Sequence, residues 1–221
     1  MQNVTALTVV YNTPELLINS VGSFKKFYPD IPLLIMNNSD KDHACSSVVS
    51  EYVERYNNVR AFNFRTNQGH GTAVDMGIKN IATDVIYYFD SDIDMKVGGA
   101  IEGMMALMND EVYGVGNVID VDTGGRNIRH DYTGERVKFL HLVVGLLNRN
   151  MYYKFHPFTR YGLPIFKALL EIHKSGNADK MIKYFPIFDY VKHLSGGTRS
   201  KFGDCEKIVE EEVSTDGHWS G

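Results

Sequence analysis

Four short apolar runs in the first 90 residues alternate with stretches of helical periodicity, and this alternation constrains the fold more than any other feature. The runs are ALTVVY (6–11), PLLIM (32–36), VRAFNF (59–64) and VIYYF (85–89). Between them, apolar residues recur at helical spacing after Pro14, over about 44–56 and over 72–81. Strands and helices that alternate with short connections form a mostly parallel sheet covered by helices on both faces. The sequence therefore predicts a Rossmann-like α/β fold.

The second half of the chain has a less regular pattern. We expect a helix over 99–109, a strand around 112–119, an amphipathic segment over 137–153 and a helix over 162–175. The segment 185–200 is expected to begin as a strand and to end in a glycine turn, whereas 201–221 is an acidic, polar tail. A chain of 221 residues suits one domain with a substantial core.

Charge and hydropathy exclude several classes of protein. A net charge of −4 argues against a nucleic-acid binder or a general membrane-surface binder, both of which usually carry a basic excess. The N-terminus lacks a basic region followed by a long apolar core, so no signal peptide is predicted. The longest apolar segment, FLHLVVGLL (139–147), is too short to span a bilayer. We expect a cytoplasmic protein without a transmembrane segment, and peripheral attachment at the inner face of a membrane stays open.

Each of the four predicted strands is followed by polar residues. They are Asn12 and the segments 37–40, 67–71 and 90–94. In open parallel sheets, ligands bind where loops leave the carboxyl ends of the strands. We therefore predict that these four loops converge on one rim and form a binding site there.

The fourth loop, in YYFDSDIDM, carries three aspartates at every second position: Asp90, Asp92 and Asp94. Carboxylates this close either raise each other's pKa or need a cation among them. Mg²⁺ and Mn²⁺ prefer oxygen ligands and are often held by one or two carboxylates together with substrate phosphates. The pattern favours a divalent-cation site at Asp90 and Asp92. A solvated acidic loop is the alternative, and Asp94 is a candidate cap for the next helix.

Over about residues 5–95 this chain resembles family 2 glycosyltransferases with the GT-A fold. The resemblance is carried by four segments that occur in the order found in that family: VVYNTPELLINSVGSF, PLLIMNNSDKD, NQGHGTAVDMGI and VIYYFDSDIDM. The resemblance implies metal-dependent, inverting transfer of a sugar from a nucleotide-diphosphate donor to a hydroxyl acceptor such as a glycan or a lipid-linked saccharide. It implies a nucleotide-sugar-binding half over 1–96. An acceptor-binding and catalytic half over 97–200 of the same domain would include a smaller acceptor-side C-terminal region.

By the same resemblance, residues from all four loops bind the nucleotide sugar. They are Tyr11, Asn12, Asn37, Asn38, Asp40, Asn67, Gly69, His70, Gly71, Asp90 and Ser91. Asp90 and Asp92 would form the metal motif, with Asp92 as the direct ligand of Mn²⁺ or Mg²⁺. The chain departs from the family at Asn37, where an aspartate is usual, and at Asp75, where an asparagine is usual.

The catalytic base is harder to predict, because the Glu-Asp pair that often supplies it in the family is not visible. Direct inversion still requires a group that takes the proton of the acceptor hydroxyl. In FDYVKHLSGGT, a strand would aim Asp189, Val191 and His193 at one face. We predict Asp189 as the base. The alternatives are Asp120, Asp122 and Asp131.

His193 is predicted as a third metal ligand, because HLSGGT resembles a C-terminal element of some GT-A enzymes. Two other functions stay open. A non-catalytic module that binds a nucleotide sugar or a carbohydrate would explain the missing Glu-Asp pair. A nucleotidyltransferase is disfavoured, because VVYNTPELL contains neither the glycine nor the lysine expected after its first strand. The oligomeric state stays open.

Overall fold

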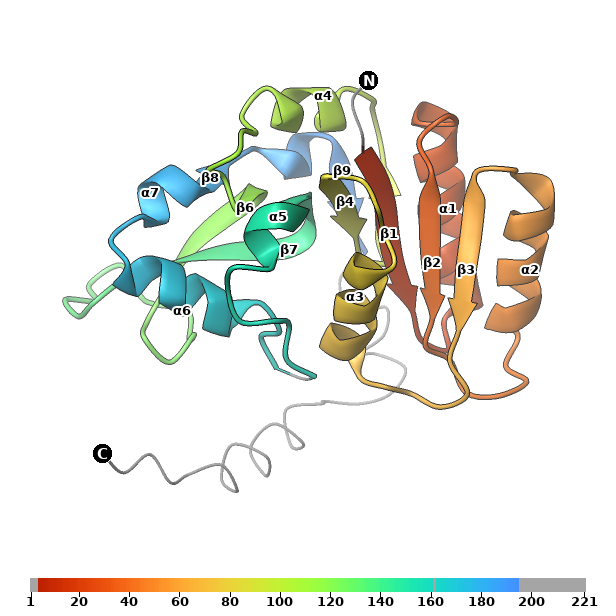
Figure 1. Ribbon diagram of the computed structural model, residues 1–221, viewed down its shortest axis with the longest axis horizontal. Coiled ribbons are helices and arrows are strands. Elements are labelled where there is room, and N and C mark those ends of the chain that lie inside the picture. The colour runs from red at the N-terminus through yellow and green to blue at the C-terminus, as the bar shows by residue number, and fades with distance from the viewer. Residues whose placement is uncertain (1–3, 161, 195–221) are drawn as a thin grey trace.

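The computed structural model describes residues 4–160 and 162–194, and a seven-stranded sheet runs through its centre (Figure 1). The strands, in chain order, are β1 (Val4–Val10), β2 (Leu33–Asn37), β3 (Val59–Asn63), β4 (Val85–Phe89), β6 (Gly114–Val121), β7 (Val137–Asn148) and β8 (Ile182–Tyr184). They lie in the order β3-β2-β1-β4-β7-β6-β8. All neighbouring pairs are parallel except the two that include β7, which is antiparallel to β4 and β6. The predicted, mostly parallel α/β sheet is confirmed.

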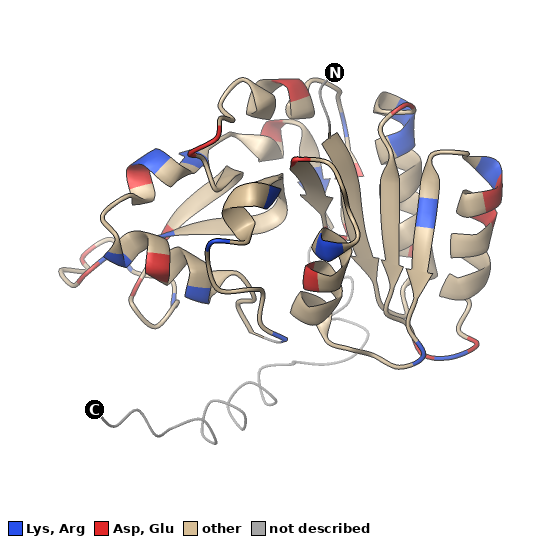
Figure 2. Cartoon of the chain, in the orientation of Figure 1, with Lys and Arg blue, Asp and Glu red and all other residues tan. Residues whose placement is uncertain are grey.

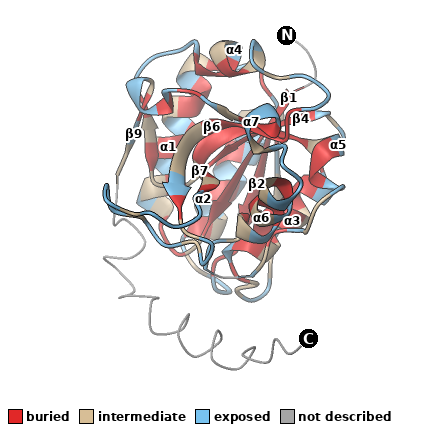
Figure 3. Ribbon diagram, turned by 90° about the vertical axis from the view of Figure 1, so that its left-hand side faces the viewer, coloured by how far each residue is buried: buried red, intermediate tan, exposed pale blue. Residues whose placement is uncertain are grey.

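Helices cover both faces of this sheet. They are α1 (Pro14–Phe27), α2 (Cys45–Arg55), α3 (His70–Lys79), α4 (Ala100–Met105), α5 (Arg149–Tyr152), α6 (Phe166–Lys174) and α7 (Ala178–Met181), with the 3₁₀ helix η1 (Ile187–Asp189). Helices α1, α2 and α4 pack on one face, and α3, α5 and α6 pack on the other. The central strands β1 and β4 are covered on both sides, and they are accordingly buried along their whole length and carry no charged residue (Figures 2 and 3).

A second, two-stranded sheet pairs β5 (Ile93–Met95) with β9 (Val191–His193). Strand β5 follows β4 almost at once, whereas β9 comes from the far end of the described chain. Their antiparallel register sets Ile93 opposite His193. This small sheet therefore carries a C-terminal segment back to the end of β4.

The structure corrects part of the second-half prediction. The segment 185–190 does not begin as a strand, because η1 occupies its middle and β9 starts only at Val191. Pro186 precedes η1 and has no N–H to offer to a strand partner, and this favours the local turn. Helix α4 is shorter than the predicted 99–109, and the segment 137–153 is mostly the strand β7. The predicted glycine turn lies outside the described residues.

No helix in the described part of the chain combines the length and the apolar character that a membrane crossing requires.

Candidate metal centre and ligand-binding rim

The first two loops are joined by a reciprocal pair of hydrogen bonds. Asn12 turns the chain out of β1 with a left-handed backbone angle, φ 51°. Its Nδ2 donates to Asp40 Oδ2 at 2.5 Å, and the backbone N–H of Asp40 donates to Asn12 Oδ1 at 3.1 Å. The backbone N–H of Asn12 also donates to Ser39 Oγ at 3.0 Å. These bonds fix the second loop against the end of β1 before any ligand binds.

The second loop is joined to the third through amide side chains. Asn38 Nδ2 donates to Asn67 Oδ1 at 2.9 Å, and the backbone N–H of Gln68 donates to Asn38 Oδ1 at 2.8 Å. Asn67 Oδ1 also accepts from the backbone N–H of Gly69 at 2.8 Å. Three of the four polar loops therefore form one hydrogen-bonded rim, as predicted from their positions after the strands.

The predicted loop glycines are required by space and by backbone conformation. Gly69 precedes α3 with φ 83°, a region that favours glycine. At Gly71, a Cβ atom would lie 1.7 Å from the backbone oxygen of Thr159, so no other residue fits without moving the chain. The backbone N–H of Gly71 donates to the Arg160 oxygen at 3.2 Å. The third loop is thereby packed against the segment that leads to α6, and nucleotide binding by both glycines stays a prediction.

Asn37 lies beneath this rim, with 2% of its surface exposed. Its Nδ2 donates to Ser46 Oγ at 3.2 Å and to Asn63 Oδ1 at 2.9 Å, and its Oδ1 accepts from the backbone N–H of Ser39 at 3.3 Å. The amide is therefore engaged in holding β2, β3 and α2 together. Its predicted contact with a nucleotide would require some of these bonds to break.

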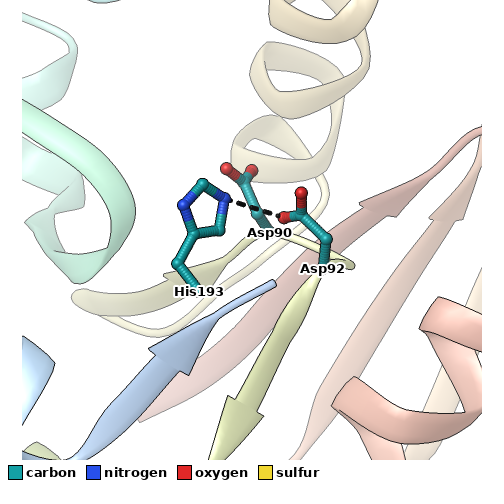
Figure 4. A group of neighbouring side chains, drawn as sticks. All are labelled: Asp90, Asp92 and His193. Atoms are coloured by element: carbon teal, nitrogen blue, oxygen red, sulfur yellow. Dashed lines mark ion pairs between the residues drawn. The ribbon is translucent and has the colours of Figure 1, made fainter. Parts of the chain in front are cut away.

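Asp90, Asp92 and His193 converge at the end of β4 (Figure 4). One ligand atom from each residue lies within 4.8 Å of the other two. His193 Nε2 lies 3.3 Å from Asp92 Oδ1. The two residues are brought together because β9 pairs with β5 and the backbone N–H of Leu194 donates to the backbone carbonyl oxygen of Asp92 at 2.8 Å. The structure brings together all three predicted metal ligands.

The chemistry of this cluster fits a divalent cation. Two carboxylates supply the oxygen ligands that hard cations prefer, and the imidazole adds a nitrogen ligand that Mn²⁺ and other transition metals accept. The side chains are 14% to 29% exposed, so a ligand can reach them from one side while the protein surrounds the other. A cation held by these three residues would have further coordination positions for a ligand such as a diphosphate.

Asp90 has two further side chains beside it, Tyr88 and His70, and His70 Nε2 lies 3.8 Å from Asp90 Oδ1. The hydroxyl of Tyr88 donates to Asp90 Oδ1, and it lies 2.9 Å from His70 Nε2. Burial, together with the charge of Asp92, raises the pKa of Asp90, while His70, Tyr88 and His193 oppose this shift. An ionised Asp90 is thus costly without positive charge nearby, and a bound cation would relieve that cost.

Sequence reasoning missed Tyr88 and His141. Tyr88 was accessible to prediction, because alternate residues of a strand share a face and Tyr88 lies two positions before Asp90. His141 was not, because a register shift in β7 sets its direction: Gly116 pairs with Gly145, but Asn117 pairs with His141. Bulges of this kind re-aim side chains beside active sites. Burial, together with the nearby His193, lowers the pKa of His141.

The argument that placed Asp189 on a strand face with His193 is wrong. Asp189 is the last residue of η1 and is exposed, and it is not part of the converging group. The three alternatives do not join that group either. Asp120 lies 3.8 Å from Arg136 Nη1, Asp122 accepts hydrogen bonds from its own loop, and Asp131 is exposed. The structure therefore places none of the four candidate bases at the cluster.

Comparison with known sequences gives one family. The family model described as "Glycosyl transferase family 2" matches residues 5–171. An uncharacterized glycosyltransferase of Haemophilus influenzae is 25% identical over 148 residues, which are 66% of this chain and 58% of that protein. The chain therefore spans less than two thirds of the length of this relative.

Comparison with solved structures gives the same architecture. The mannosyltransferase PcManGT from Pyrobaculum calidifontis, in complex with GDP-Man and Mn²⁺, matches with a TM-score of 0.64 at 11% identity, over 84% of this chain and 55% of that one. TarS 1-349 of S. aureus, in complex with UDP-GlcNAc, matches with a TM-score of 0.58 at 13% identity, over 88% of this chain and 61% of that one. At these identities the likeness shows the shared GT-A fold.

Proposed function

We propose that this chain, which belongs to glycosyl transferase family 2, transfers a sugar from a nucleotide-diphosphate donor to a hydroxyl acceptor. The observation that carries the proposal is the cluster of Asp90, Asp92 and His193 on a rim where hydrogen-bonded loops meet. Family membership makes a sugar nucleotide the expected ligand of such a rim. The two solved structures of similar fold contain donors of this class, GDP-Man and UDP-GlcNAc.

We assign the donor to the rim formed by residues 1–96. Asn12, Asp40 and the loop 67–71 would contact the nucleoside, with Asp92 and His193 as the direct ligands of a cation and Asp90 beside them. When bound, the cation would neutralise negative charge that develops on the diphosphate as it leaves. Mn²⁺ is the ion we expect, because the donor set combines imidazole with carboxylate.

We assign the acceptor to the side formed by residues 97–200, and we propose a glycan or a lipid-linked saccharide as its class. Both halves share the central sheet, because β7 pairs directly with β4. Inversion requires a base on this side. Asp189 is the first residue to test, because it lies close in sequence to β9, whose His193 reaches the cluster.

Donor turnover tests the proposal. GDP-mannose, UDP-N-acetylglucosamine and related sugar nucleotides are incubated with the protein and Mn²⁺, and release of the nucleoside diphosphate is measured with and without acceptor glycans. We expect release with at least one donor, and loss of that release in Asp92→Asn. Release that is unchanged in Asp92→Asn would contradict the assignment of the site. If Asp189 is the base, Asp189→Asn should lower turnover roughly a hundredfold or more while donor affinity stays unchanged.

A second function, a module that binds a sugar nucleotide without turning it over, is favoured by one observation. The residue predicted as the base, Asp189, lies in η1 and not on the strand β9 that carries His193. Binding of donor and Mn²⁺ without any release of nucleotide over many hours, with any acceptor, would identify such a module.

A further inference from the structure

A buried hydroxyl links helix α3 to the candidate metal centre. Tyr88 lies in β4 with 1% of its surface exposed, and its hydroxyl is the hydrogen-bond partner of both Asp90 Oδ1 and His70 Nε2. His70 belongs to the third polar segment, 67–71, and is the first residue of α3. The three side chains therefore connect a loop of the rim to one carboxylate of the cluster.

The direction of the two hydrogen bonds follows from the single proton of the phenol. The hydroxyl has one proton to donate, and the carboxylate of Asp90 can only accept. That proton is donated to Asp90, and the phenol oxygen is then the acceptor for His70 Nε2–H. A hydrogen bond to a carboxylate is charge-assisted and strongly directional. It engages Oδ1 of Asp90 and so restricts the orientation of the carboxylate.

The neighbouring tyrosine provides a comparison within the same strand. Tyr87 is also fully buried, but it faces the opposite side of the sheet, where it packs against Phe24 and Phe89. Among the described residues its hydroxyl has no hydrogen-bond partner. Two adjacent buried tyrosines therefore differ in one respect: only the hydroxyl on the α3 side is tied to the cluster.

We propose that Tyr88 is a positioning residue for the metal centre, and that His70 sets the direction of its hydroxyl. Tyr88 holds the Asp90 carboxylate in the orientation that a divalent cation and its diphosphate require. The same link makes the cation site sensitive to the third loop, since His70 begins the helix that follows this loop. The proposal rests on the proposed function, because it supposes that Asp90 contributes to binding a cation and a sugar nucleotide.

The test compares Tyr88→Phe with Tyr87→Phe in the full chain. Each substitution removes one buried hydroxyl and leaves the ring in place, so both should fold, as checked by circular dichroism and urea unfolding. Mn²⁺ binding without nucleotide is measured by electron paramagnetic resonance. Loss of a side chain that orients a metal ligand typically costs tenfold to a hundredfold in metal affinity. We expect a loss of about this size in Tyr88→Phe and unchanged affinity in Tyr87→Phe.

Two variants of His70 test the hydrogen bond between His70 and the Tyr88 hydroxyl. His70→Ala should weaken Mn²⁺ binding less than Tyr88→Phe does, and His70→Gln, which keeps an N–H donor, should restore part of the loss. If donor turnover occurs, excess Mn²⁺ should restore it in Tyr88→Phe, as a positioning role requires. A fold defect would not be rescued in this way.

The outcomes separate this inference from the proposed function. Weaker Mn²⁺ binding in Tyr88→Phe, with no turnover by any variant, supports the positioning role and counts against the transferase. Equal Mn²⁺ affinity in Tyr88→Phe and the unaltered protein overturns the positioning role, even if turnover is observed. Absence of Mn²⁺ binding by the unaltered protein overturns it as well.

Discussion

The rim to which we assign the donor and the half to which we assign the acceptor are built differently. In the rim, hydrogen bonds of Asn12, Asn38 and Asn67 join loop to loop, and Asp90 of the cluster accepts a hydrogen bond from the buried Tyr88. In the half assigned to the acceptor, the loop between β6 and β7 is largely exposed, and its Arg136 pairs at the surface with Asp120 of β6. A fixed rim suits a ligand whose shape is constant, whereas an exposed loop tolerates change. We infer that the donor site is pre-organised and that acceptor preference is set by the more exposed half.

The largest effect is expected where the rim is most tightly packed. Gly71→Ala would force a Cβ atom against the backbone of Thr159, and we expect a loss of about 3 kcal/mol in the free energy of unfolding. Urea unfolding measures it. Gly22→Ala in α1 is the matched control, because its Cβ would meet only the Tyr52 hydroxyl at 3.6 Å, and helix propensity predicts a gain of up to about 1 kcal/mol. Equal effects of the two changes would contradict the tight packing at Gly71.

The next largest effect is expected at the two hydrogen bonds between Asn12 and Asp40, which join the first two loops. Asn12→Ala removes both side-chain hydrogen bonds and places alanine at a positive φ, so we expect a loss of about 2 kcal/mol. Asn12→Gly removes the same bonds but relieves the backbone, and it should therefore lose less. If the rim is pre-organised, both variants should weaken nucleotide binding, as measured by calorimetry. Unchanged nucleotide binding would show that the bonds between Asn12 and Asp40 do not contribute to the binding site.

Asp90 should destabilise the protein when no cation is bound. Its pKa is raised on folding, so its unfavourable contribution is fully present at neutral pH and disappears as the pH falls below the usual aspartate value of 3.8. Asp90→Asn should therefore raise the urea midpoint at pH 7 in the presence of a chelator, and the gain should shrink toward pH 4. A gain that is the same at both pH values would contradict burial as the cause.

The smallest effect is expected on the acceptor side. Arg136→Ala breaks an exposed ion pair with Asp120, and such pairs contribute less than about 1 kcal/mol. Its urea midpoint should stay close to that of the unaltered protein, and nucleotide affinity should not change. A loss as large as that of Asn12→Ala would show that the acceptor side is as fixed as the rim.

The sequence predicted the first four strands and the loops after them well because this information is local. Apolar runs of strand length, helical spacing between them and polar residues after each run were enough to place the four loops on one rim. The cluster of Asp90, Asp92 and His193, our candidate metal ligands, was predicted from motif and resemblance. Tyr88 was also within reach, since it shares a strand face with Asp90.

The remaining features depend on contacts that the sequence does not display. The direction of His141 depends on the pairing of β7 with β6 and on a shift in that register. The hydrogen bonds that Asn37 donates go to Ser46 in α2 and Asn63 in β3, two elements whose packing the sequence does not show. The prediction for Asp189 was wrong because it extended a strand through Pro186. Proline has no N–H to donate to a neighbouring strand, and this argued against a strand at that position.

Calorimetric titration of UDP and GDP, with and without Mn²⁺, into the unaltered protein and Asp92→Asn tests the central claim most directly. The exchange of a carboxylate for an amide keeps the shape of the side chain but removes its charge. We predict that Mn²⁺ strengthens the binding of at least one nucleotide by tenfold or more, which corresponds to about 1.4 kcal/mol of binding free energy. We also predict that Asp92→Asn abolishes this gain. Nucleotide binding that is absent, or equally dependent on Mn²⁺ in both proteins, would contradict the claim.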